Sequence, residues 1–181
     1  MRRLFLSAAL LISATALLAG CGGSDSSGTS AADWASGYCG DSTTWVTALD
    51  DARASVKTGT APDEAAQSVT DETNSFIESI NGLGTPDTPD GSTSEATAKS
   101  LANTLSGRVA RLSAALDTNN PDVTVAQQTT IVRTQVEASL NDVKTTTAKL
   151  GQDDAELGTA MAASSDCTSL NAALVKASAG S

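Results

Sequence analysis

Apolar side chains recur every three or four residues along most of this 181-residue chain, and this spacing limits its fold more than any other feature. The sustained alternation of apolar and polar residues that is typical of strands is absent from the sequence. The clearest helical run covers residues 122–150, where eight positions keep the spacing: Val125, Thr129, Val132, Val136, Leu140, Val143, Thr147 and Leu150. The chain is therefore predicted to be all-α.

Four long amphipathic helices are predicted, separated by glycine and proline residues. Their approximate bounds are 31–57, 60–83, 92–116 and 122–150, and two shorter helices are expected at 153–163 and 168–177. Thr60 is the predicted N-cap of the second helix, and Gly40 is a candidate break in the first. Helices of this length joined by short loops favour an up-down four-helix bundle. The short C-terminal helical segment is expected to be tied back onto it.

Residues 1–20 have the features of a bacterial lipoprotein signal peptide. Two arginines precede an apolar run over residues 4–18, which is shorter than the roughly 20 residues that a membrane-spanning helix needs. The run leads into a Leu-Ala-Gly-Cys motif that ends at Cys21. This motif resembles the lipobox of bacterial lipoproteins, whose cysteine thiol receives a diacylglyceryl group and whose signal is cut just before it. Cys21 is the predicted lipidation site, and an ordinary secretory signal with a chance cysteine is the alternative.

Residues 21–30 are mostly glycine and serine and are predicted to form a flexible tether. Residues 31–181 then form a helical domain, which the lipid anchor holds at the extracytoplasmic face of the cell membrane. No later segment is apolar enough to be a transmembrane candidate. Because an acidic domain is repelled by anionic lipid headgroups, we expect no membrane contact beyond the anchor.

Cys39 and Cys167 remain as an even pair once Cys21 carries lipid. The predicted turns place both at the same end of the bundle, so a disulfide between them is compatible with the topology. Such a bridge forms in oxidising compartments. It would close a loop of about 128 residues, which in the chain-entropy model stabilises the fold by about 4–5 kcal/mol. A metal pair and a reactive thiol are the alternatives, although two cysteines without histidine or a CxxC motif make a poor metal site.

The composition excludes several classes of function. The formal charge is −10, with 21 acidic and 11 basic residues, which argues against a nucleic-acid partner because phosphate binding needs a basic surface. The sequence has no histidine, which removes Ser-His and Cys-His catalytic pairs and histidine-ligated zinc. We therefore expect no enzyme activity and no cofactor. Catalysis by carboxylates alone is an alternative, but no pair of carboxylates stands out.

The acidic cluster at Asp153, Asp154 and Glu156 is interpreted as the start of a helix, where acids complement the helix dipole. Weak binding of a divalent ion is the alternative for this cluster. A second feature is the aromatic stripe of the first helix, formed by Trp34, Tyr38 and Trp45. These aromatic side chains either belong to the core or line a ligand pocket.

Two functions follow from these features. The first is a membrane-anchored, non-catalytic interaction or structural module whose partner is an envelope protein or polymer. The second is a small-ligand or lipid-binding helical bundle with an aromatic-lined pocket.

Several short motifs together resemble those of small helical lipoproteins and secreted proteins of actinobacteria. They are the lipobox at Cys21 with its Gly/Ser linker, then Trp34, Cys39-Gly40 and Trp45, a loop with Gly84, Pro86, Asp87 and Gly91, and the late Cys167. The resemblance covers the full chain. It implies an envelope location and a helical fold, and it adds no activity.

Overall fold

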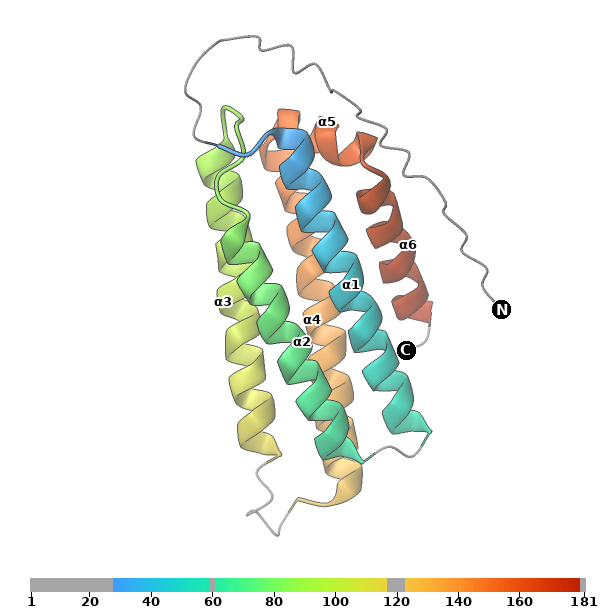
Figure 1. Ribbon diagram of the computed structural model, residues 1–181. Helices are drawn as coiled ribbons and strands as arrows, with labels where there is room; N and C mark the ends of the chain where they lie inside the picture. Colours follow the sequence, from blue (N-terminus) through green and yellow to red (C-terminus); the bar gives the residue numbers. More distant parts are fainter. Residues whose placement is uncertain (1–27, 59–60, 117–122, 180–181) are drawn as a thin grey trace, which may run out of the picture.

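The computed structural model describes residues 28–58, 61–116 and 123–179, and these residues form six helices and no strand (Figure 1). The prediction of an all-α chain is therefore confirmed for this part. The expected signal peptide, Cys21 and residues 22–27 of the predicted tether lie outside the described residues. The helices are α1 (Ala31–Lys57), α2 (Pro62–Gly82), α3 (Gly91–Ala115), α4 (Val125–Asp153), α5 (Ala155–Ala163) and α6 (Ser165–Ala179).

Helix α1 begins at a serine cap and continues without a break. The Ser30 side chain accepts a hydrogen bond from the Asp33 backbone N–H, which satisfies one of the donors left open at a helix start. The suggested break at Gly40 is wrong, because α1 runs through it to Lys57. Eleven residues of α1 are buried, and this packing outweighs the roughly 1 kcal/mol that a glycine costs inside a helix.

The starts of α2 and α4 differ slightly from the predicted ones. The N-cap of α2 is Ala61, which makes no side-chain cap, so the predicted Thr60 cap is wrong, and Pro62 fixes the first turn instead. Helix α4 starts at Val125 because Thr124 and Gln127 form a capping box. The predicted helix spans are otherwise matched to within a few residues.

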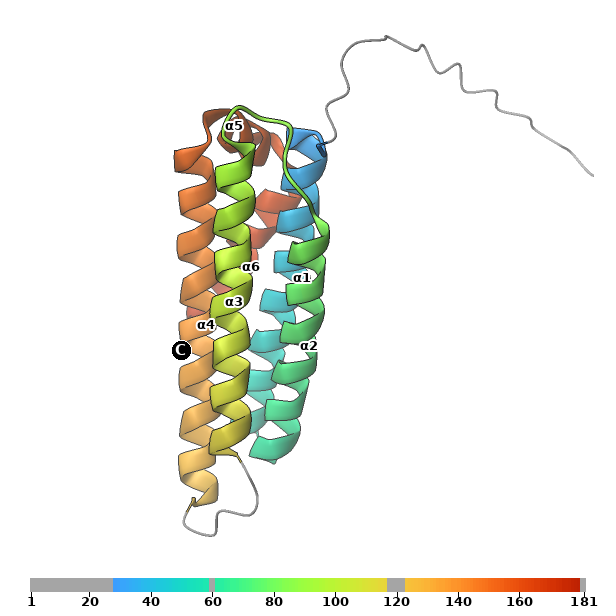
Figure 2. The same cartoon turned by 90° about the vertical axis from the view of Figure 1, so that its left-hand side faces the viewer.

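Four helices run side by side with alternating directions, as Figures 1 and 2 show for α1, α2, α3 and α4. Helix α1 packs against α2, α2 against α3, and α3 against α4. Helix α5 lies at the end of the molecule where α1 begins, and α6 then returns along α1. The C-terminal part is thus more extensive than the predicted short segment, because α6 has 15 residues and packs along α1.

The core is built from all six helices and contains many small side chains. Trp34, Tyr38 and Trp45 are its largest apolar members, together with leucines from every helix except α2. Alanines such as Ala35, Ala66, Ala98 and Ala102 fill positions where leucine would bury more area, so the helices gain less from burial per residue.

Residues 28–30 lead into α1, and Thr29 among them is hydrogen-bonded to the end of α2 and the loop that follows it. The Thr29 N–H donates to the Thr85 carbonyl at 3.1 Å, and the Asp87 N–H donates to the Thr29 carbonyl at 2.8 Å. The Thr29 hydroxyl also donates to the Leu83 carbonyl at 3.1 Å. These residues are the last three of the predicted tether, so the chain enters the domain bound to this loop.

Candidate functional site

The three aromatic residues of the predicted stripe lie in the core. Trp34 and Tyr38 are fully buried and stacked with ring centroids 5.4 Å apart. Trp45 is 2% exposed and stacks on Phe76 at 4.8 Å. Such stacked pairs add stability beyond their buried area. The stripe therefore serves as the packing surface between α1 and its neighbours.

The polar atoms of the stripe are bound inside the protein. Trp34 Nε1 donates to the Gly84 carbonyl at 2.9 Å, and Trp45 Nε1 donates to Thr73 Oγ1 at 3.1 Å. Because the Thr147 hydroxyl donates to a backbone carbonyl, Tyr38 donates its hydroxyl proton to Thr147 Oγ1 at 3.2 Å. Burial raises the pKa of Tyr38 to about 12. No group of the stripe is left over to orient a ligand.

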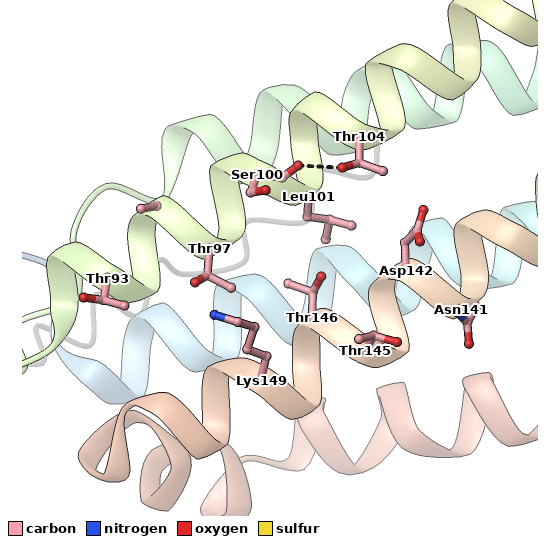
Figure 3. Close-up of a pocket in the computed structure, with 11 residues that line it drawn as sticks. Thr93, Thr97, Ser100, Leu101, Thr104, Asn141, Asp142, Thr145, Thr146 and Lys149 are labelled. Carbon is pink, nitrogen blue, oxygen red and sulfur yellow. Dashed lines mark hydrogen bonds between the residues drawn. The ribbon is translucent and has the colours of Figure 1, made fainter.

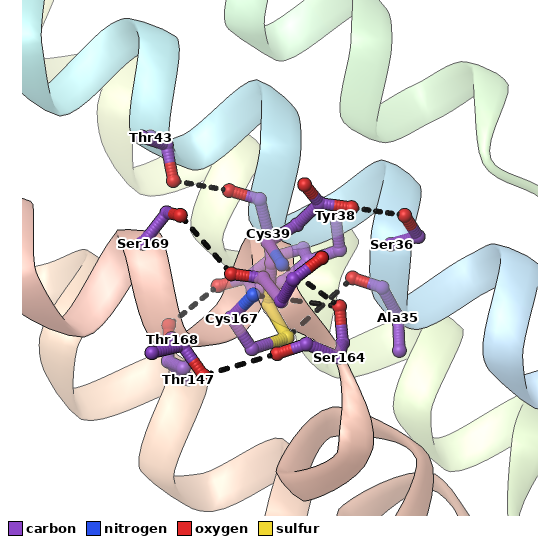
Figure 4. The surroundings of a disulfide bond; sticks show 12 residues. Ala35, Ser36, Tyr38, Cys39, Thr43, Thr147, Ser164, Cys167, Thr168 and Ser169 are labelled. Atoms are coloured by element: carbon purple, nitrogen blue, oxygen red, sulfur yellow. Dashed lines mark hydrogen bonds between the residues drawn. A yellow bond between two sulfur atoms is a disulfide. The ribbon is translucent and has the colours of Figure 1, made fainter.

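The disulfide between Cys39 and Cys167 is present, as predicted. It joins α1 to the first turn of α6, with Cα atoms 4.8 Å apart, and Figure 4 shows Tyr38 and Thr147 close to it. Cys167 therefore lies inside a helix rather than between the two short helices. The Ser36 hydroxyl donates to the Asp166 carboxylate beside it, which adds a second link between the same two helices.

Asp154 is a buried carboxylate at the junction of α4 and α5. It accepts hydrogen bonds from the Leu157 N–H at 3.0 Å, the Thr88 hydroxyl at 2.5 Å and the Ser94 hydroxyl at 3.0 Å. Burial raises its pKa, but these hydrogen bonds lower it further, so the pKa of Asp154 lies below the usual value. The structural interpretation of the acidic cluster is therefore favoured. Among the described residues, no three His, Cys, Asp or Glu side chains are grouped so that they could hold a metal ion.

Arg53 is a buried cation that the sequence analysis did not identify. Its side chain is 2% exposed, and the guanidinium donates to Asp50 Oδ1 at 2.5 Å and to the Ala177 carbonyl at 2.6 Å. This carbonyl lies in the last turn of α6, where a cation complements the helix dipole. Arg53 therefore fixes one end of α6 on α1, and the disulfide fixes the other. Nothing in the local sequence distinguishes it from a surface arginine.

A groove of about 450 Å³ between α3 and α4 is the candidate interaction site (Figure 3). Leu101 is a buried residue between its walls, and Asn141 adds an amide on the α4 side. Hydroxyl groups line both walls, contributed by Thr93, Thr97, Ser100, Thr104, Thr145 and Thr146. The four hydroxyl residues of α3 are spaced four, three and four positions apart, which places them on one face of the helix. This polar stripe is a signal that the sequence analysis missed.

The charges around this groove are paired. Asp142 Oδ2 lies 2.6 Å from Arg108 Nε, and Lys149 Nζ lies 2.6 Å from Asp153 Oδ2. Asp142 is the only carboxylate among the described residues that line the groove, so an acid–base pair of facing carboxylates is not available there. Neutral hydroxyls and an amide remain, and these groups suit a partner that offers hydrogen-bonding groups of its own.

Comparisons with protein-family models, with curated proteins and with solved structures found no significant match. Within the described ranges, no helix has the length and the apolarity that crossing a membrane would require.

Proposed function

We propose that this chain is an extracytoplasmic lipoprotein, anchored in the cell membrane through lipid on Cys21. In this proposal it is a non-catalytic interaction or structural module of the cell envelope. The observation that carries the proposal is the Leu-Ala-Gly-Cys motif at Cys21, directly after the apolar run of residues 4–18. The Cys39–Cys167 disulfide supports it, because disulfides persist in oxidising compartments and are rare in the cytosol.

The helices α1 to α4 would act as an up-down four-helix bundle with one end toward the membrane. The chain enters the domain at Thr29, which is bound to the loop after α2. A segment from Cys21 to Gly28 spans at most about 25 Å when fully extended. The end of the bundle with this loop and α5 would therefore stay within that distance of the anchor, and the sides of the bundle would project away from the membrane.

The α3–α4 groove is the surface that we assign to partner binding. It runs along the side of the bundle, and its hydroxyl groups can exchange hydrogen bonds with a protein or polymer of the envelope. Because the flanking Asp142 and Lys149 are already paired, charge attraction would contribute little and the contact would depend weakly on salt.

The alternative function, a bundle with an aromatic-lined pocket for a small ligand or lipid, has less support. Trp34, Tyr38 and Trp45 are buried, and each polar atom of these rings is hydrogen-bonded inside the protein. A ligand that reached them would have to displace core packing.

Anchoring is tested by expressing the full chain and its Cys21→Ala variant in a bacterium with lipoprotein processing. Cells are fed an alkyne fatty acid, and the membrane and soluble fractions are examined for label. We expect label and membrane retention for the unchanged chain and the loss of both for the variant. A Cys21→Ala chain that still carries label would contradict the proposed anchor.

Partner binding is tested with a photo-crosslinking amino acid placed at Thr97, inside the groove. The control position is Ser68, an exposed residue of α2 outside the groove. We expect a reproducible crosslinked partner from Thr97 and none from Ser68. The absence of an enriched partner at Thr97 would count against the interaction module.

A further inference from the structure

Helix α6 packs along α1 and makes little contact with α4, which leaves a groove between α4 and α6. A cavity of about 460 Å³ lies between α4, α5 and α6, and a smaller one of about 130 Å³ lies further along α4 and α6. Lys144 and Leu174 line both cavities, so the two adjoin. The larger volume falls within the range of about 300–1,000 Å³ that is typical of small-molecule sites.

The floor of the larger cavity is apolar. Met161, Cys167 and Leu174 each expose only 5–7% of their surface, and all three line this cavity. The methionine side chain is flexible, so it can adapt its shape to a bound chain. Ala148 stands at the wall with a side chain too small to fill the space.

The charge around the larger cavity is the opposite of the charge of the whole chain. The formal charge of the chain is −10, yet this cavity is lined by Lys144 and by no carboxylate among the described residues. Lys144 also forms no ion pair with any residue in the described ranges, whereas Lys99, Lys149 and Lys176 each do. A desolvated apolar floor beside an unneutralised ammonium group complements an anion that carries an apolar chain.

We propose that the α4–α6 groove binds an anionic amphiphile and holds one of its acyl chains in the larger cavity. The acyl chain lies on Met161, Cys167 and Leu174, and the anionic head group is within reach of the Lys144 ammonium. The anion is a fatty-acid carboxylate or the phosphate of an anionic phospholipid, since both offer the same chemistry. This binding function goes beyond the proposed interaction module and does not depend on lipid at Cys21.

Two variants and two matched controls test the site. Lys144→Glu reverses the charge at the rim, and Ala148→Trp fills the cavity from an exposed wall position. The controls are Arg111→Glu and Ala110→Trp, which make the same kinds of change at exposed positions of α3 outside both cavities. Far-UV circular dichroism checks that each chain is folded, and Lys144→Glu decides the outcome if Ala148→Trp does not fold.

Binding is measured by equilibrium dialysis of the full chain against radiolabelled palmitate. We expect saturable binding that weakens at least tenfold in Lys144→Glu, is lost in Ala148→Trp, and stays within twofold of the unchanged chain in both controls. A cationic amphiphile of the same chain length, hexadecyltrimethylammonium, is expected to bind at least tenfold more weakly. The proposal is overturned if the cation binds equally well, or if the variants behave like the controls.

The source of the anion is distinguished with vesicles of phosphatidylcholine that contain phosphatidylglycerol. The chain is mixed with the vesicles, separated from them, and examined by native mass spectrometry for a non-covalent lipid mass. Recovery of phosphatidylglycerol would identify a bilayer lipid, whereas binding of palmitate alone would identify a free fatty acid. A chain that takes up neither ligand would refute the site, and this result is separate from the labelling of Cys21.

Discussion

Removal of the disulfide, as Cys39→Ala with Cys167→Ala, is expected to lower the free energy of unfolding by about 5 kcal/mol. The bridge spans a sequence separation of 128 residues. In the chain-entropy model the stabilisation grows with the logarithm of the closed loop and reaches about 4.7 kcal/mol for 100 residues. Because domains are usually stable by only about 5–15 kcal/mol, the variant should lie close to its unfolding threshold.

The native position of α6 is expected to survive this change. Its far end is held by the Arg53 guanidinium, which donates to the Ala177 carbonyl at 2.6 Å, and by the 3.7 Å pair of Lys176 with Asp50. The bridge therefore acts mainly on the unfolded chain, which becomes less restricted when it is removed.

The assay is urea unfolding followed by circular dichroism, with hydrogen exchange to locate α6. Three samples are compared: the oxidised chain, the same chain reduced with dithiothreitol, and the double variant. The reduced chain keeps both sulfur atoms in the core, so it separates the loss of the crosslink from the loss of packing. We expect the reduced chain and the double variant to lose similar stability, while the α6 amides stay as well protected as those of α1 to α4.

Two results would refute this reasoning. A loss below about 1 kcal/mol in the reduced chain would show that the crosslink does not restrict the unfolded state as the model requires. Loss of α6 protection while the amides of α1 to α4 stay protected would show that α6 opens locally without the bridge, and that Arg53 does not hold it in place alone.

Four further predictions concern single residues. Tyr38 is the only tyrosine, and its pKa of about 12 means that phenolate absorbance should not appear near pH 10. Because the unfolded chain ionises at lower pH, the free energy of unfolding should fall between about pH 10 and 12. A midpoint of the absorbance titration near pH 10 would contradict the burial of this side chain. Asp154→Ala should cost about 2 kcal/mol at pH 7 by urea unfolding. Because the folded-state pKa of Asp154 is lowered, the stability difference between the unchanged chain and the variant should shrink as the pH falls below about 4. A stability difference that does not change with pH would contradict the lowered pKa. Gly40→Ala should raise the free energy of unfolding by about 0.5–1 kcal/mol, since a Cβ there meets nothing within 4 Å. Gly158→Ala should lower the free energy of unfolding, since its Cβ would lie 2.4 Å from the Gly151 carbonyl oxygen. Equal effects at the two glycines would be inconsistent with these contacts.

The helices could be read from local patterns, since each depends on spacing and caps within a few residues. Most predicted bounds agree to within a few residues, and the two starts that differ are set by Pro62 in α2 and by the capping box at Thr124 in α4. The disulfide was also predictable, because two cysteines remained and the turns placed them at one end. The Gly40 break was wrong because its cost depends on the burial of the whole helix, which local propensity does not contain.

The candidate grooves required the tertiary structure. The hydroxyl stripe of α3 is visible in the sequence, but only the packing of α3 on α4 brings it opposite Thr145 and Thr146. The groove at Lys144 exists because α6 packs on α1 and leaves α4 uncovered there, and no local signal specifies that choice of neighbour. Arg53 and Asp154 likewise become buried only in the folded chain. Arg53 contacts Ala177, which is 124 residues away, and Asp154 contacts Thr88, which is 66 residues away.

The sequence by itself predicted the helical class, the helix bounds to within a few residues and the cysteine pairing, and it is the sole basis of the proposed lipid anchor. These properties follow from short-range spacing, from composition, and from a count of cysteines. The tertiary structure alone decided that the aromatic stripe is core, that α6 covers α1, and where the grooves lie. The physical reason is that the apolar stripe of an amphipathic helix determines which of its faces is buried. The partner of that face depends on how all the helices pack together.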